Sequence, residues 1–156
     1  MKNFSGVCQA AGADKPLRAF FIWITNIVTL MVLEIIKNIA VAGAGSFIGG
    51  AARCFVSLIM KGVSKGYPWA TLAVNLAGCF LIGLLWGVFS KNGTEGGNWA
   101  LFLTAGFCGG FTTFSTFSKE ALMMLQSGNL WGFVGYVAFS VVVGIALVAL
   151  GYFLVR

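Results

Sequence analysis

Long uncharged stretches alternate with short polar corners along most of this chain. The corners are rich in glycine and polar residues and fall at residues 61–68, 90–98 and 126–129, the last preceded by an amphipathic turn of helix that begins at Lys119. Between them the apolar residues run on continuously, without the alternation of period two that indicates β-strands. Each stretch has the roughly 20 residues that a helix needs to cross a bilayer. The pattern therefore predicts four membrane-spanning helices, at residues 36–60, 69–89, 99–118 and 130–155.

The first 34 residues do not fit this pattern. Residues 19–33 are apolar, but a stretch shorter than about 18 residues is more often interfacial or signal-like than a full span. Lys15 and Arg18 precede it as in a signal peptide, no convincing cleavage site follows, and Met31 is an alternative start. We therefore expect an N-terminal extension of doubtful structure at residues 1–34 and a four-helix membrane domain at residues 35–156.

Composition supports a membrane protein and argues against other classes. Of the 156 residues, 59% are hydrophobic and 9% are charged, whereas a soluble domain has about 25% charged residues. Histidine is absent and no nucleophile–base pair is evident, so we expect no enzyme. The four cysteines lack metal-site spacing and fit apolar packing better than metal ligation or disulfides. The net charge of +6 is spread singly over the ends of the stretches, which is typical of membrane flanks and not of nucleic-acid binding.

The basic residues give almost no preferred orientation in the membrane. Four spans place three of them on each side: Lys37, Lys91 and Arg156 on one, and Lys61, Lys65 and Lys119 on the other. Orientation normally follows an excess of basic residues on the cytoplasmic side. A chain without that excess can insert both ways, and opposite copies can pair about a two-fold axis in the membrane plane. Counting residues 19–33 as a further span would remove the balance.

The third stretch has a composition that a plain membrane anchor does not need. Three glycines, Gly106, Gly109 and Gly110, precede hydroxyl residues that are interleaved with phenylalanines up to Ser118. Glycine weakens a helix by roughly 1 kcal/mol relative to alanine. An interrupted helix is tolerated in lipid only where its backbone meets protein, water or an ion. We therefore expect this helix to be broken near its middle and to take part in conduction.

Phe114 and Phe117 stand about one turn apart on one helical face, near the hydroxyls of Ser115, Thr116 and Ser118. Aromatic packing explains most such pairs, but these hydroxyls make the face too polar for lipid. The positive edges of the rings and the hydroxyl donors together form a weakly electropositive path. Because conduction requires weak binding at several sites, the pattern predicts a path for a small anion that accepts hydrogen bonds.

Polar residues in the other spans are candidates for the same path. Asn75 offers amide donors at membrane depth, or alternatively joins two helices. Arg53 is a cation inside the first span, where it either attracts anions into a vestibule or extends to the headgroups. Tyr136 and Ser140 lie four positions apart and share a face of the fourth span.

Three segments resemble the CrcB/Fluc family of fluoride channels: residues 49–53 (Gly-Gly-Ala-Ala-Arg), 71–75 (Thr-Leu-Ala-Val-Asn) and 106–118 (Gly-Phe-Cys-Gly-Gly-Phe-Thr-Thr-Phe-Ser-Thr-Phe-Ser). The third segment is the highly specific one, and the resemblance covers roughly residues 38–156. It implies an antiparallel, dual-topology homodimer in the bacterial inner membrane that exports fluoride passively through two narrow pores.

The resemblance also implies roles for single residues. It assigns Asn75 as the pore asparagine, and Phe114 and Phe117 as the phenylalanine box that lines the fluoride pore. Ser115, Thr116 and Ser118 would supply hydroxyls nearby, and Tyr136 and Ser140 would form a polar track on the fourth span. Arg53 would sit at a vestibule. Gly109 and Thr112 of both subunits would offer backbone carbonyls to a structural sodium ion (Na+) on the two-fold axis. Gly144 stands where another hydroxyl would continue the track, and residues 1–34 have no counterpart.

Two other functions compete with a channel. A small dual-topology, proton-coupled multidrug exporter needs a carboxylate inside the membrane, whereas Glu34 and Glu120 lie at the edges of predicted spans. A non-conducting scaffold would need only close-packing glycine faces such as Gly45-x-x-x-Gly49 and Gly83-x-x-x-Gly87. It leaves the phenylalanine–hydroxyl pattern unexplained. The residues by themselves predict a small anion; fluoride comes from the resemblance.

Overall fold

The computed structural model describes residues 5–62 and 66–156, with side chains from residue 18 onward. In this part of the chain the regular structure is helical, and four helices are long and apolar enough to cross a membrane: Arg18–Gly62, Trp69–Asn92, Asn98–Gln126 and Leu130–Val155. The prediction of an all-helical, multi-pass membrane protein is therefore confirmed. Lys65, which entered the charge balance, lies outside the described residues.

The first helix, α1 (Ser5–Ile59), begins well before the predicted first span. Glu34 and Lys37 do not interrupt it, because their side chains form an ion pair of 2.7 Å across one helical turn. The chain divides into two compact units, Met1–Ile39 and Ala40–Arg156. All the residues that the sequence proposes for the pore, the vestibule and the ion site belong to the second unit.

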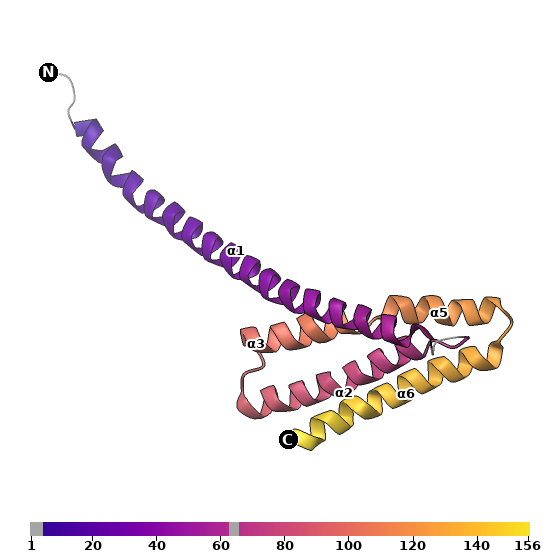
Figure 1. The fold of residues 1–156 in the computed structure, drawn as a ribbon. Helices are drawn as coiled ribbons and strands as arrows, with labels where there is room; N and C mark the ends of the chain where they lie inside the picture. Colours follow the sequence, from indigo (N-terminus) through magenta and orange to yellow (C-terminus); the bar gives the residue numbers. More distant parts are fainter. Residues whose placement is uncertain (1–4, 63–65) are drawn as a thin grey trace. The chain divides into compact units, whose positions relative to one another are not determined.

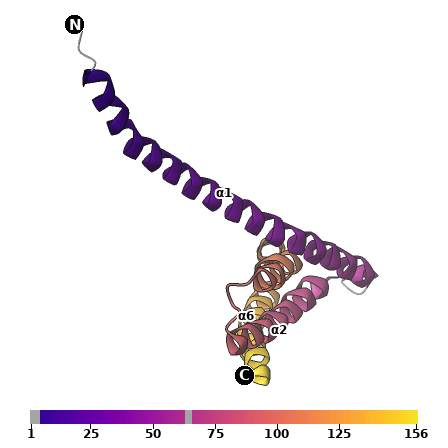
Figure 2. The same ribbon diagram turned by 90° about the vertical axis from the view of Figure 1, so that its left-hand side faces the viewer.

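In the second unit, α2 (Trp69–Asn92) and α6 (Leu130–Val155) lie side by side and run in the same direction (Figures 1 and 2). Glycines make this approach possible. A Cβ at Gly83 would lie 2.9 Å from the carbonyl carbon of Val148, and one at Gly87 would lie 2.8 Å from the backbone carbonyl oxygen of Tyr152. Because a bulkier residue would push the helices apart, the predicted close-packing role of Gly83-x-x-x-Gly87 fits this interface.

The third membrane-length helix consists of four consecutive segments, the second of them π-helical: α3 (Asn98–Leu101), η2 (Phe102–Cys108), α4 (Gly109–Phe111) and α5 (Phe114–Gln126). Its first half packs against the part of α1 that belongs to the second unit. A Cβ at Gly45 would lie 2.9 Å from the Cα of Gly106, and one at Gly49 would lie 2.8 Å from the amide nitrogen of Phe111. The second predicted glycine face therefore also lies at a close helix contact.

Thr112 and Thr113 separate α4 from α5 with extended backbone. The dihedral angles are φ −82° and ψ 162° at Thr112, and φ −148° and ψ 110° at Thr113. Thr113 then caps the next helix, because its side-chain oxygen accepts a hydrogen bond from the amide of Thr116 at 3.3 Å. The glycine-rich segment thus leads directly into two non-helical residues.

The third helix continues past Ser118, the predicted end of the third span, because α5 runs to Gln126 and includes the turn of helix expected after Lys119. Lys119 is exposed, whereas Glu120 is partly buried. Glu120 therefore lies in this continuation, with its side chain turned toward the other helices.

Candidate anion pathway

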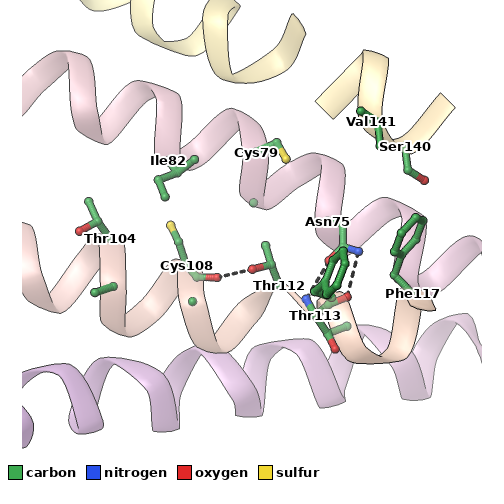
Figure 3. Close-up of a pocket in the computed structure, with 14 residues that line it drawn as sticks. Asn75, Cys79, Ile82, Thr104, Cys108, Thr112, Thr113, Phe117, Ser140 and Val141 are labelled. Carbon is green, nitrogen blue, oxygen red and sulfur yellow. Dashed lines mark hydrogen bonds between the residues drawn. The ribbon is translucent and has the colours of Figure 1, made fainter. Parts of the chain in front are cut away.

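Asn75 of α2 and Thr113 are joined by two hydrogen bonds (Figure 3). The Asn75 Oδ1 accepts from the Thr113 amide at 2.8 Å, and its Nδ2 donates to the Thr113 carbonyl at 3.2 Å. In an α-helix that amide would bond to the carbonyl of Gly109, so the asparagine supplies a partner where the helical one is lost. An amide group has two N–H donors, and the bond to the Thr113 carbonyl uses one of them.

A cavity of about 670 Å³ lies beside this pair, between α2, α6 and the third helix. We call it the groove. Its lining is mostly apolar, and it brings together six of the residues that the sequence singled out: Asn75, Gly109, Thr112, Phe114, Phe117 and Ser140. An apolar cleft with a few convergent polar groups is the usual form of a small-ligand site.

Aromatic rings lead from the groove into the core of the second unit. The rings of Phe114 and Phe117 have centroids 5.9 Å apart, and the Phe117 ring lies 5.0 Å from that of Tyr136. Phe114 is 80% exposed at one end of this series, and Tyr136 is 0% exposed at the other. The rings are tilted against each other, an arrangement that presents ring edges to neighbouring groups.

Ser140 lines the groove, and its hydroxyl oxygen is buried and has no hydrogen-bond partner among the described residues. A buried hydroxyl without a partner costs about 1–3 kcal/mol. An unpaired buried polar atom beside a cavity is a candidate for contact with a ligand or a water molecule. Tyr136 differs from it: its hydroxyl donates to Glu120 Oε2 at 2.9 Å. Of the two residues of the expected polar track, Tyr136 therefore has a partner on α5, whereas Ser140 has none among the described residues.

Glu120 is a candidate that the sequence did not place in the site. Its Oε1 accepts from the Thr71 hydroxyl at 2.8 Å, while its Oε2 accepts from Tyr136. The carboxylate thus ties α5 to both α2 and α6. Thr71 and Glu120 are far apart in the sequence, and the only available signal was an acidic residue directly after a hydroxyl-rich segment.

Arg53 lines a second cavity, of about 250 Å³, together with Thr71, Thr113 and Thr116. Thr113 borders this cavity and the groove. Its hydroxyl donates to the Thr116 hydroxyl at 3.0 Å. Arg53 therefore lines a cavity next to the groove and does not line the groove itself, and Thr113 borders both.

Two of the predicted hydroxyl residues, Ser115 and Ser118, are exposed and do not line the groove in this chain. The Ser118 hydroxyl donates to the Phe114 carbonyl at 2.9 Å. The Ser115 oxygen lies 3.4 Å from that of Thr113. Both hydroxyls are thus engaged close to their own helix turn.

The carbonyls of Gly109 and Thr112 have lost the amide partners that an α-helix would give them. Those partners would be the amides of Thr113 and Thr116. The Thr113 amide donates to Asn75 instead, and the Thr116 amide donates to the Thr113 side chain. Carbonyl oxygens released in this way are suitable ligands for a hard monovalent cation.

The fold defines a multi-pass membrane protein, and the groove gives it a candidate site lined by neutral polar and aromatic residues. The profile of the family described as CrcB-like protein, Camphor Resistance (CrcB), matches residues 40–152. The chain therefore belongs to the CrcB family, as the segments at 49–53, 71–75 and 106–118 predicted. The matched region lies within the second unit.

Named relatives agree with this assignment. The chain is 42% identical to the fluoride-specific ion channel FluC of Azobacteroides pseudotrichonymphae genomovar. CFP2 over 120 residues. The aligned region covers 76% of this chain and 96% of that protein. It is 37% identical over 122 residues to the protein of the same name from Desulfotalea psychrophila, covering 78% and 94%. It is also 41% identical over 112 residues to the fluoride-specific ion channel FluC 1 of Yersinia pseudotuberculosis, covering 72% and 88%.

Proposed function

We propose that this protein is a fluoride channel that lets fluoride leave the cytoplasm passively. One observation carries the proposal: Asn75 and Ser140 line the groove together with Phe114 and Phe117, and the buried Ser140 hydroxyl has no partner among the described residues. The family membership supports fluoride as the ion, since curated relatives carry the name fluoride-specific ion channel.

Neutral donors suit a small anion that must also be released. Hydroxyl and amide hydrogens replace part of the hydration shell of the ion, and ring edges add a weak positive potential. A lysine or arginine inside the groove would hold the ion more tightly, and conduction requires binding that is weak and repeated. Arg53, on the other side of Thr113, raises the local anion concentration from its own cavity, which we take as the vestibule.

In this proposal the channel is an antiparallel homodimer. The groove is bordered by Phe114, which is 80% exposed in one copy. A second copy, inverted about an axis in the membrane plane, would cover this ring and complete the path. The nearly equal numbers of basic residues at the two ends of the spans support insertion in both orientations.

The extended residues Thr112 and Thr113 would be the break in the third helix and would lie near the two-fold axis. We propose that the carbonyls of Gly109 and Thr112 from both copies hold a structural sodium ion there. The displaced amide partners of these carbonyls support the assignment. When bound, the ion would supply positive charge that joins the two copies.

Family membership and the four apolar helices also favour an inner-membrane location in a bacterium. The named relatives come from bacteria such as Yersinia pseudotuberculosis. The surrounding partner is then membrane lipid.

One observation favours a second candidate, a proton-coupled exporter. Glu120 lies within a helix of membrane-spanning length, and a proton-coupled exporter needs a carboxylate inside the membrane. However, both carboxylate oxygens are occupied by hydroxyl donors, and Glu120 does not line the groove. It borders a different cavity, of about 440 Å³, near Tyr67 and Met123.

Fluoride efflux from liposomes that contain the purified protein tests the proposal, with chloride efflux measured in parallel. A fluoride channel releases fluoride without a proton gradient and retains chloride. Flux that requires a proton gradient would favour the exporter, and no flux would favour a scaffold.

A further inference from the structure

Gly144 of α6 and Cys79 of α2 face each other next to the groove. Gly144 is buried, and a Cβ added to it would lie 3.3 Å from the Cys79 Sγ. Position 144 is one turn beyond Ser140 on the same face of α6. The sulfur therefore lies against the point at which a side chain from position 144 would begin. Cys79 itself lines the groove together with Ser140 (Figure 3).

We infer that the Cys79 thiol is the next group that the anion meets after Ser140, in place of a side chain from position 144. This inference rests on the proposed fluoride channel. The row of donors that begins at Ser140 thus continues on α2, because Gly144 leaves room for a thiol there. An S–H group donates only weakly and sulfur is polarizable, so this step binds the ion less than a hydroxyl would.

The contact between Cys79 and Gly144 alone would fit apolar packing. Cys79 in addition lines the groove beside Ser140 and lies one turn beyond Asn75 on the same face of α2, which places its thiol in line with the donors of the proposed path. The other described cysteines are natural controls. Cys108 also lines the groove and is 2% exposed, and Cys54 lines the Arg53 cavity instead.

A thiol in a narrow path is also a site of chemical modification, and methyl methanethiosulfonate is a small neutral probe for it. The thiol loses its proton to solvent, and the thiolate attacks the sulfur that carries the methyl group. A disulfide forms and methanesulfinate leaves. The added methylthio group would then stand in the groove and obstruct the ion.

The first test is fluoride efflux before and after this reagent. The reagent should reduce the fluoride flux at least about tenfold, which corresponds to about 1.4 kcal/mol, in wild type, Cys54→Ser and Cys108→Ser. Cys79→Ser should keep its flux after treatment. Full inhibition of Cys79→Ser, or protection by Cys108→Ser instead, would overturn the inference.

The second test removes the hydrogen-bond donor at Cys79 of α2 and then supplies a donor from position 144 of α6. Cys79→Val should slow fluoride about tenfold or more because methyl groups cannot donate, whereas Cys79→Ser should stay within about twofold of wild type. Cys79→Ala should be slowed, and adding Gly144→Ser to it should restore flux. Equal flux in wild type and Cys79→Val would overturn this inference but not the channel; absence of flux in wild type would overturn the proposed function itself.

Discussion

Asn75 binds the backbone of Thr113 with both ends of its side-chain amide, at 2.8 Å to the N–H and 3.2 Å to the carbonyl. This contact holds the extended residue between α4 and α5 and uses one of the two amide hydrogens of Asn75. It gives Asn75 the helix-joining role that was one of the two alternatives from the sequence, and its role as a donor to the anion stays a prediction.

Replacement of Asn75 should therefore affect stability as well as conduction. Asn75→Leu leaves an amide and a carbonyl of Thr113 unpaired, at a cost of about 1–3 kcal/mol each. We expect a lower melting temperature in detergent and no fluoride flux. Asn75→Asp keeps an acceptor for the Thr113 amide, so it should melt closer to wild type. Wild-type stability in Asn75→Leu would show that the two bonds do not matter.

Phe114→Ile should slow fluoride strongly and leave the dimer intact, because it removes the ring edge at the groove but keeps an apolar side chain. Phe153→Ile is the matched control: Phe153 is 70% exposed on α6 and does not line the groove. Efflux and cross-linking measure the two effects. If Phe114→Ile conducts like wild type, Phe114 has no part in the pore.

Gly49 and Gly50 are neighbours with opposite tolerances for a side chain. A Cβ at Gly49 meets the backbone of the third helix, whereas a Cβ at Gly50 meets nothing within 4 Å. Gly49→Ala should destabilise the folded protein by about 1–3 kcal/mol, as overpacking does. Gly50→Ala should be nearly neutral. Thermal unfolding of both variants in one detergent compares them, and equal stabilities would contradict the close contact between α1 and the third helix.

Sodium removal tests the proposed ion site. If Gly109 and Thr112 bind sodium through backbone carbonyls, replacing sodium by N-methylglucamine should weaken the dimer and reduce fluoride flux. Thr112→Val removes the hydroxyl bond to the Cys108 carbonyl at 2.9 Å but keeps the Thr112 carbonyl. It should therefore show the same dependence on sodium. Flux and dimer stability that ignore sodium would end this part of the proposal.

Apolar length alone located the four membrane helices, since backbone groups in lipid must be satisfied within a helix. The fourth helix coincides with its predicted range at 130–155. The burial of Glu120 in the third helix could not be predicted in this way, because its partners come from other helices.

The site was only partly predictable, because its contacts also join residues of different helices. Periodicity shows which residues share a face, but it does not show which face meets which helix. Asn75 and Ser140 were therefore identified as candidates, while the bond to Thr113 and the contact between Cys79 and Gly144 were not. Composition also cannot tell a hydroxyl that lines a cavity, as in Ser140, from one that bonds its own helix, as in Ser118.

The reversal potential in a planar bilayer tests the central claim most directly. A fluoride gradient is imposed across the membrane, with equal chloride concentration and equal pH on both sides. Passive conduction through neutral donors and aromatic edges predicts current that reverses at the fluoride equilibrium potential and does not move when a pH gradient is added. A reversal potential at zero, or one that follows the pH gradient, would contradict the account.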